Sequence, residues 1–154
     1  MPAATKPGAA DSAGLGLEAW KGFVRAHARL FSELDVELQQ AENVTLGDYD
    51  VLVQLADSPV KSMRMCELAE SVLLSPSGLS RRVERLERRG LVRRERSAQD
   101  ARSVEASITD EGRRLFRRLR RLHRDGIDRH FSSRFTEREL ETLGPLLGRL
   151  TGDE

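Results

Sequence analysis

The chain has 154 residues, of which 38% are hydrophobic and 33% charged, and its formal net charge at pH 7 is +1. This length suits one domain that buries a core of its own. Only 5% of the residues are aromatic, which argues against a β-sandwich and against a sheet that stacks RNA bases, and the near-zero total charge by itself indicates no partner.

The sequence carries no signal for export, for a membrane or for catalysis. Cys66 is the single cysteine, so no internal disulfide can form and a reducing, cytoplasmic location is expected. No apolar run approaches the roughly 20 residues of a membrane span, and residues 1–14 have the composition of a disordered tail. The motifs of common enzyme classes are missing, and the three histidines form no ligand cluster. We therefore expect no enzyme, no cofactor and no metal site.

A long first helix is predicted from Leu17 to about Gln40, because its apolar residues recur every seven positions. The two seam positions are occupied by Leu17, Val24, Phe31 and Leu38 and by Trp20, His27 and Leu34. Such a seam packs against other helices, either those of a second subunit or those of the same chain. The sequence leaves both alternatives open.

Two shorter helices are predicted next. The first begins after Thr45, a good N-cap, with Asp48 in its first turn where an acid favours the helix dipole. It should end before Ser58-Pro59, because the residue before a proline disfavours helix. The second covers about Met65 to Val72.

Residues 75–91, SPSGLSRRVERLERRGL, carry the start and stop signals of another helix. Ser75 is the expected N-cap, Pro76 fits the first helical position, and Gly90 can adopt the left-handed conformation that ends a helix. The residues predicted to face the core are Leu79, Val83 and Leu86. The arginines expected on the exposed face are Arg81, Arg82, Arg85, Arg88 and Arg89. With the preceding short helix, this segment predicts a helix-turn-helix.

A β-hairpin is predicted directly after the basic helix. Leu91-Val92 begins one strand, and the alternation of Val104, Ala106 and Ile108 with polar residues indicates the other. Two further helices are predicted after Thr109 and after the capping box at residues 136–139. The expected fold class is mainly α with a small β-wing.

Positive charge is concentrated in residues 81–102, which hold nine arginines and four acids. One basic segment in a near-neutral chain suggests a polyanion that docks at one place. The small residues at the start of the basic helix let its backbone approach the floor of a major groove, where arginines reach guanine edges or phosphates. Arg102, near the hairpin tip, suits a narrow minor groove. The alternative for each of these arginines is an ordinary solvated surface with ion pairs.

The candidate DNA contacts follow from this arrangement. They are Pro76, Ser77, Ser80, Arg81, Arg82, Arg85, Arg94, Arg96 and Arg102.

The run LAESVLLSPSGLSRRVERLERRGLVRRERSAQDARSVEASIT resembles the core of the MarR family of winged-helix transcription regulators. Three pieces carry the resemblance: LSPSGLSRRVERLE followed by GLV, DAR at residues 100–102, and IT with Gly112 three residues later. The flanking helices are similar to the family's dimerisation region. The resemblance therefore covers about residues 17–150.

The resemblance implies a homodimer whose winged lobes reach successive major grooves of double-stranded DNA. It also implies that Asp100 supports the wing by pairing with an arginine and that Arg102 enters the minor groove. Many family members release DNA when a small aromatic or anionic effector binds between the dimer base and the winged lobe. Candidate residues for such a pocket are Trp20, His27, Phe31 and Tyr49, for which packing in the core is the alternative.

We therefore expect a winged helix-turn-helix at residues 45–109, flanked by dimerisation helices at residues 15–44 and 110–154. The predicted function is a ligand-responsive repressor that binds a palindromic operator as a homodimer. The alternative is a winged-helix module that docks an acidic protein partner. Cys66 lies in a different helix from the reactive cysteine of redox-sensing relatives, which favours a structural thiol.

Overall fold

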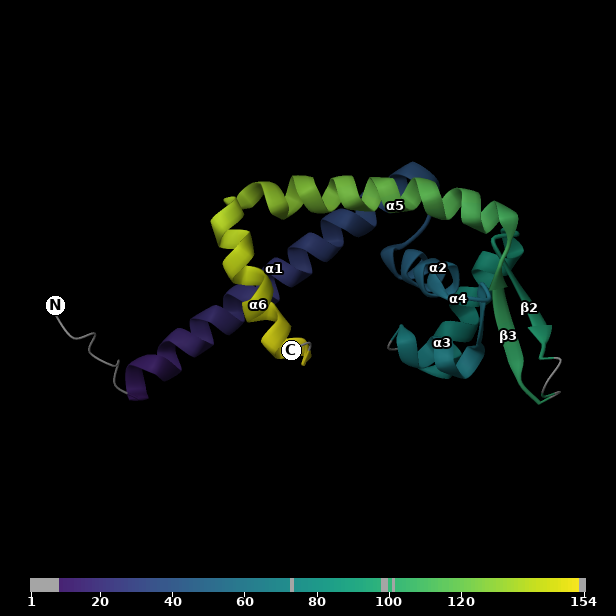
Figure 1. The fold of residues 1–154 in the computed structure, drawn as a ribbon, viewed down its shortest axis with the longest axis horizontal. Helices are drawn as coiled ribbons and strands as arrows, with labels where there is room; N and C mark the ends of the chain where they lie inside the picture. Colours follow the sequence, from purple (N-terminus) through teal and green to yellow (C-terminus); the bar gives the residue numbers. More distant parts are fainter. Residues whose placement is uncertain (1–8, 73, 98–99, 101, 153–154) are drawn as a thin grey trace.

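A computed structural model describes residues 9–72, 74–97, 100 and 102–152. Within them lie six α-helices, one short 3-10 helix and a small antiparallel sheet, which confirms the mainly α fold with a β-wing. Helix α5 (Asp110–His130) runs along one edge of the molecule, with the winged lobe beneath one end and helices α1 (Ala9–Glu42) and α6 (Glu137–Thr151) toward the other (Figure 1).

Helix α1 begins eight residues before the predicted start at Leu17. The prediction of a tail at residues 1–14 is therefore wrong for residues 9–14, whereas residues 1–8 lie outside the described part. Alanine has the highest helix propensity, and a nucleated helix gains one hydrogen bond for each residue added, so Ala9 and Ala10 continue it.

The helix-turn-helix has the local signals that the sequence predicts. Helix α2 (Leu46–Asp57) begins with a capping box in which the Thr45 side chain accepts from the Asp48 amide and the Asp48 carboxylate accepts from the Thr45 amide. Helix α3 (Met65–Ser71) leads to helix α4 (Pro76–Arg88), whose N-cap Ser75 accepts from the Gly78 amide.

Helix α4 ends in a Schellman motif, as Gly90 predicts. Gly90 has a φ of 71° and donates its amide to the Glu87 carbonyl, while the Leu91 amide donates to the Leu86 carbonyl. This turn leads the chain from α4 directly into the hairpin.

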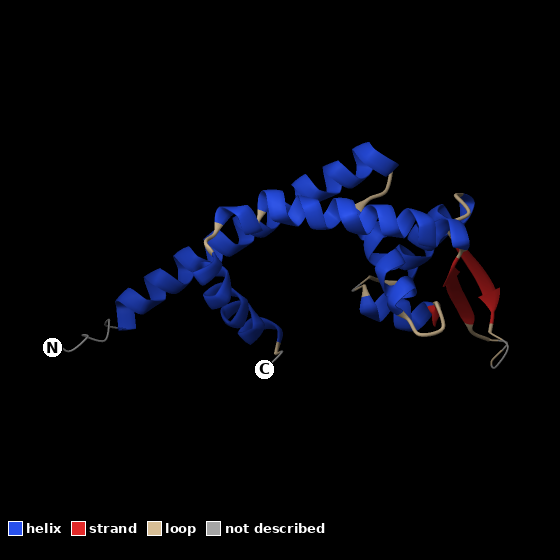
Figure 2. Ribbon diagram, turned by 45° about the horizontal axis from the view of Figure 1, so that its top comes forward, coloured by secondary structure: helices blue, strands red, loops and turns tan. Residues whose placement is uncertain are grey.

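The sheet has the order β1-β3-β2, with every pair antiparallel. Strands β2 (Val92–Arg96) and β3 (Val104–Ile108) form the predicted hairpin, and it projects beyond the helices (Figure 2). Strand β1 (Ser62–Arg64), which pairs with the other edge of β3, was not predicted. Three residues are too few to show an alternating pattern, so this strand depends on its partner.

One apolar core joins helices α2 to α5 and the sheet. Leu79, Val83 and Leu86 of α4 are fully buried in it, as predicted. Helix α4 lies against α2, α3 and β2, and the same core extends to β3 and to the first half of α5. The apolar face of α4 is therefore held by the core, and the opposite face is exposed to solvent.

Apart from Leu38, which belongs to this core, the seams of α1 and α6 remain outside it. Leu34 and Leu38 at the end of α1 are buried, but Trp20 is 62% exposed and Phe31 is 51% exposed. In α6 none of the residues is buried, and Leu150 is 72% exposed. Packing within one chain therefore accounts for only the last two turns of the α1 seam.

A close contact at Gly112 connects the wing to α5. A Cβ at this position would overlap the backbone carbonyl oxygen of Leu91, and Leu91 also accepts from the Thr109 amide. We expect Gly112→Ala to lower the free energy of unfolding by about 1–3 kcal/mol, because a backbone atom has to move. Urea unfolding measures this change.

Gly22→Ala is the matched control, because a Cβ at Gly22 has no neighbour within 4 Å. Alanine there should be neutral or stabilise the chain by up to about 1 kcal/mol through helix propensity. Equal effects of the two substitutions would contradict the close contact at Gly112.

Candidate nucleic-acid interface

Helix α4 presents its N-terminal turn to solvent. Pro76 and Ser77 are exposed and Ser80 is partly exposed, while the apolar residues of the helix point into the core. Arg81 is exposed, and its Nε lies 3.4 Å from the carbonyl oxygen of Ser77. No ion pair of the described residues involves Arg81, so its guanidinium is available to a ligand.

Arg82 and Arg85 turn toward helix α2. The Arg82 Nη1 donates to the Thr45 hydroxyl at 3.1 Å and lies 3.4 Å from an oxygen of Asp48. Arg85 forms an ion pair with the same oxygen. In this conformation both arginines bind a protein carboxylate, although the sequence places them with Arg81 among the DNA contacts.

Of the three wing arginines predicted to contact DNA, Arg94 binds a carboxylate of the protein, whereas Arg96 and Arg102 are exposed. Arg94 donates through Nε to Glu87 of α4 at 2.8 Å, and the Arg94 amide donates to the other oxygen of Glu87 at 2.9 Å. Arg96 and Arg102 are exposed and take part in no ion pair of the described residues. Glu87 therefore holds the wing against α4, and no local sequence pattern indicated this contact.

Asp100 acts on the wing through the backbone. Its Oδ1 accepts from the Arg102 amide at 3.0 Å, and the Asp100 carbonyl accepts from the Ser103 amide at 2.9 Å. Within the described residues it pairs with no guanidinium, which differs from the expected ion pair. A short acidic side chain commonly closes a turn in this way.

A cleft of about 620 Å³ lies between α1, α2 and α5. Phe31, Tyr49 and His123 line it, together with the carboxylates of Asp35 and Asp50. Burial raises the pKa of Asp50 and lowers the pKa of His123, so this histidine is neutral at pH 7.

Only two of the four predicted pocket residues line this cleft. Phe31 does so, and Tyr49 does so while packing on Phe116 in the core at 5.9 Å between ring centroids. The rings of His27 and Phe31 pack at a tilt, with 4.2 Å between their centroids, and Trp20 lies nearer the N-terminus of α1. Because α1 and α5 are distant in sequence, no local signal indicated His123.

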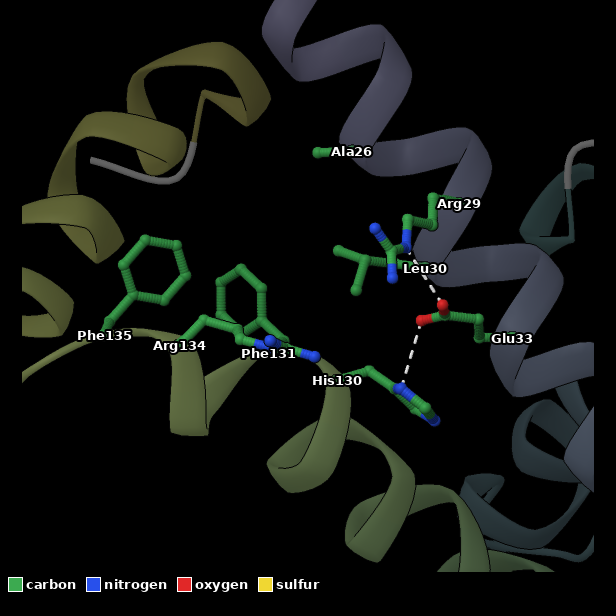
Figure 3. A pocket seen from close by; sticks show the side chains of 8 residues that line it. All are labelled: Ala26, Arg29, Leu30, Glu33, His130, Phe131, Arg134 and Phe135. Atoms are coloured by element: carbon green, nitrogen blue, oxygen red, sulfur yellow. Dashed lines mark hydrogen bonds and ion pairs between the residues drawn. The ribbon is translucent and has the colours of Figure 1, made fainter.

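A second hollow, of about 290 Å³, lies between α1 and the end of α5 (Figure 3). Leu30, Phe131 and Phe135 make it apolar. At its edge the His130 Nδ1 lies 3.0 Å from Glu33, and the His130 Nε2 lies 2.7 Å from Glu37. The hydrogen bond from His130 lowers the pKa of Glu37. These contacts, with the ion pair between Arg129 and Glu37, join α1 to α5.

Cys66 is exposed. No group of three or more potential metal ligands comes together among the described residues, and none of the described helices is long and apolar enough to cross a membrane.

The contact between Glu87 and Arg94 generates a pH prediction. The hydrogen bonds from Arg94 lower the pKa of Glu87 from 4.5, so the ionised form stabilises the fold. The two side chains are 31% and 33% exposed, and for such a pair we expect Glu87→Gln to cost about 0.5–1 kcal/mol at pH 7. The loss should be full above pH 4.5 and should vanish as the pH falls through the lowered pKa, because wild-type Glu87 is then protonated too.

Urea unfolding of both proteins at pH 7 and pH 3 measures this difference. Glu84→Gln is the control, since Glu84 is exposed on the same helix and belongs to no ion pair of the described chain. A loss that is equal at both pH values would mean that the charge of Glu87 does not hold the wing.

Comparisons with known proteins agree with this geometry. The sequence model of the MarR family matches residues 42–103. The HTH-type transcriptional regulator PecS of Dickeya dadantii is 36% identical over 84 residues, which are 54% of this chain and 50% of PecS, so the chain spans half the length of that relative. The HTH-type transcriptional repressor MdtR of Bacillus subtilis is 29% identical over 79% of this chain and 78% of its own.

Solved structures extend the likeness to nearly the whole chain. Sco3205 of Streptomyces coelicolor, a MarR family transcriptional regulator in complex with DNA, has a TM-score of 0.81 and is 32% identical over 97% of this chain and 90% of its own. AbsC from the same organism has a TM-score of 0.76 and is 29% identical over 97% of this chain and 99% of its own. The chain therefore belongs to the MarR family of transcriptional regulators.

Proposed function

We propose that the chain is a repressor that binds a palindromic operator as a homodimer and releases it when a small molecule binds. The observation that carries DNA binding is the exposed first turn of α4 with Arg81, next to the exposed Arg96 and Arg102 of the wing; none of the three forms an ion pair with a described residue. In a helix-turn-helix, side chains at the start of the second helix contact base edges in the major groove. The likeness to Sco3205, whose structure contains DNA, supports the same reading.

The proposed homodimer accounts for the exposed seams. Residues 15–44 and 110–154 carry large apolar side chains that one chain leaves open, and apolar surface of this extent marks an interface. Two winged lobes related by a two-fold axis would read half-sites about 10 bp apart.

The cleft between α1, α2 and α5 is the proposed effector site. Its volume suits a small organic ligand, and the rings of Phe31, Tyr49 and His123 favour an aromatic one. Asp35 and Asp50 line it, and among the described residues no Lys or Arg does. Within one chain this lining favours a neutral or cationic aromatic molecule over the anionic class that the family resemblance suggests.

The test of function is a fluorescence-anisotropy titration with the DNA upstream of the gene for this protein. Random DNA of equal length and two salt concentrations serve as references. Tight, salt-dependent binding to the upstream fragment alone supports the repressor, and this complex then serves to screen effectors. Binding to neither DNA by a folded dimer would contradict it and favour the acidic protein partner.

Arg81→Ala should weaken operator binding by about 1–3 kcal/mol, because one base or phosphate contact is removed. If Arg81 reads a base, the loss on random DNA is smaller. Arg114→Ala is the control, since Arg114 is exposed on α5 and paired with Glu111. An unchanged operator affinity for Arg81→Ala would contradict the assignment.

The single tryptophan reports on the proposed dimer. Trp20 lies on the open seam of α1, so a dimer should bury it and shift its emission to the blue. Val24→Glu, on the same seam, should produce a monomer by sedimentation with red-shifted emission, whereas Val60→Glu, which is 76% exposed in a loop, should change neither. A wild-type monomer with water-exposed Trp20 would contradict the α1 interface.

A further inference from the structure

Asp48 is a carboxylate buried between helices α2 and α4. Its side chain is only 2% exposed, and one of its oxygens accepts from the Thr45 amide in the capping box of α2. The other faces Arg82 and Arg85 of α4. A buried charge is tolerated only when partners satisfy it, so the position of Asp48 and the positions of the two arginines depend on each other.

The first turn of α2 is shaped to receive the guanidinium of Arg82. The Thr45 hydroxyl accepts from Nη1 at 3.1 Å. At Gly47 a Cβ would overlap the guanidinium, so the absence of a side chain lets Arg82 lie directly on the helix. Arg82 is 24% exposed, and its Nε is buried. This guanidinium would have to leave its site before it touched DNA.

Arg81 is the natural comparison, because it is the neighbour of Arg82 and carries the same group. It projects from the open face of α4, with only a long contact to the carbonyl of Ser77. Two adjacent arginines of one helix therefore meet different surroundings. One binds a buried acid of the same chain, and the other meets solvent.

We propose that Asp48 is a positioning residue for the recognition helix, and that Arg82 is held by it and does not read bases. Asp48, Thr45 and Gly47 set the angle of α4 on α2 and so determine which side chains face the groove. This inference rests on the proposed DNA binding by α4. In this proposal Arg81 contacts the DNA, whereas Asp48 and Arg82 hold α4 in the orientation that allows the contact.

Asp48→Asn distinguishes a positioning role of Asp48 from a purely electrostatic effect on DNA binding. Asp48→Asn removes a negative charge near the DNA, and simple attraction would then strengthen binding to the operator and to random DNA alike. A positioning role predicts that operator affinity falls while affinity for random DNA stays constant or rises, because Arg82 and Arg85 are freed for phosphates. We expect the ratio of the two affinities to fall about tenfold, as for one misplaced base contact.

The salt dependence distinguishes the two neighbouring arginines. Arg82→Met, which keeps the apolar stem, should lower operator affinity without reducing the slope of log K against log salt, because no phosphate contact is lost. A slope reduced by about one unit for Arg82→Met would place Arg82 on a phosphate and overturn the proposal. A specificity ratio unchanged in Asp48→Asn would also overturn it.

Gly47→Ala keeps every charge and tests the same contact by displacing the guanidinium. It should lower the specificity ratio in the same direction as Asp48→Asn. Asp57→Asn, at the exposed end of α2, is the control and should leave the ratio unchanged. Each variant is used at a temperature at which circular dichroism shows it to be folded.

A measurement without DNA separates failure of this proposal from failure of the proposed function. Urea unfolding of Asp48→Asn, Arg82→Met and the double variant forms a double-mutant cycle. The double variant should lose clearly less stability than the sum of the single losses, and α4 amides should exchange faster in Asp48→Asn. Additive losses with unchanged exchange would overturn the contact itself. A non-additive cycle in a protein that binds no DNA would reject only the DNA function.

Discussion

The arrangement of the winged lobe depends on how a single buried carboxylate is satisfied. Asp48 closes the capping box of α2 and binds two arginines of α4, so one charge fixes both a helix end and a helix pair. The same turn of α2 forms part of the cleft wall through Leu46 and Gly47, and Asp35 of α1 accepts the Leu46 amide at 2.6 Å. A ligand that moves this turn therefore moves the support of the recognition helix, without any contact between the ligand and DNA.

Local signals predicted the fold well, because helix ends are determined by neighbours in sequence. Ser75, Thr45 and Thr136 each cap the helix that they were predicted to begin. Strand β1 escaped prediction because it forms only against β3. The candidate DNA-binding site was harder to predict than the fold. The sequence identified the arginines, but which of them can contact DNA depends on the contacts of Arg82 with Asp48 and of Arg94 with Glu87. Both contacts join separate elements, so no local pattern indicates them.

The contrast between the two halves of the chain has a physical cause. The winged lobe closes its own core, with Leu79, Val83 and Leu86 fully buried. Helix α1 is instead fastened to α5 at one end, where His130 bridges Glu33 and Glu37, and Gly126 lets Leu34 and Glu37 approach closely. Beyond this junction Trp20, Val24 and Phe31 of the α1 seam are largely exposed. The end of the α1 seam therefore packs within the chain, and the remainder is the surface that the proposed dimer would bury.

The arginines of α4 and its C-cap also fall into two groups: some contact other helices of the chain, and others are exposed. Arg82 and Arg85 bind Asp48, and Arg89 donates to the carbonyl oxygens of Glu42 and Asn43, which satisfies the end of α1. Three of the five arginines of the segment thus hold α4 against the first two helices. Among the described residues, Arg81 and Arg88 are the two of these five arginines that neither pair with an acid nor donate to another helix. Of these two, only Arg81 lies near the small-residue turn that can enter a groove. Counting charges therefore overstates the reading surface, because most of this helix's guanidiniums already serve the fold.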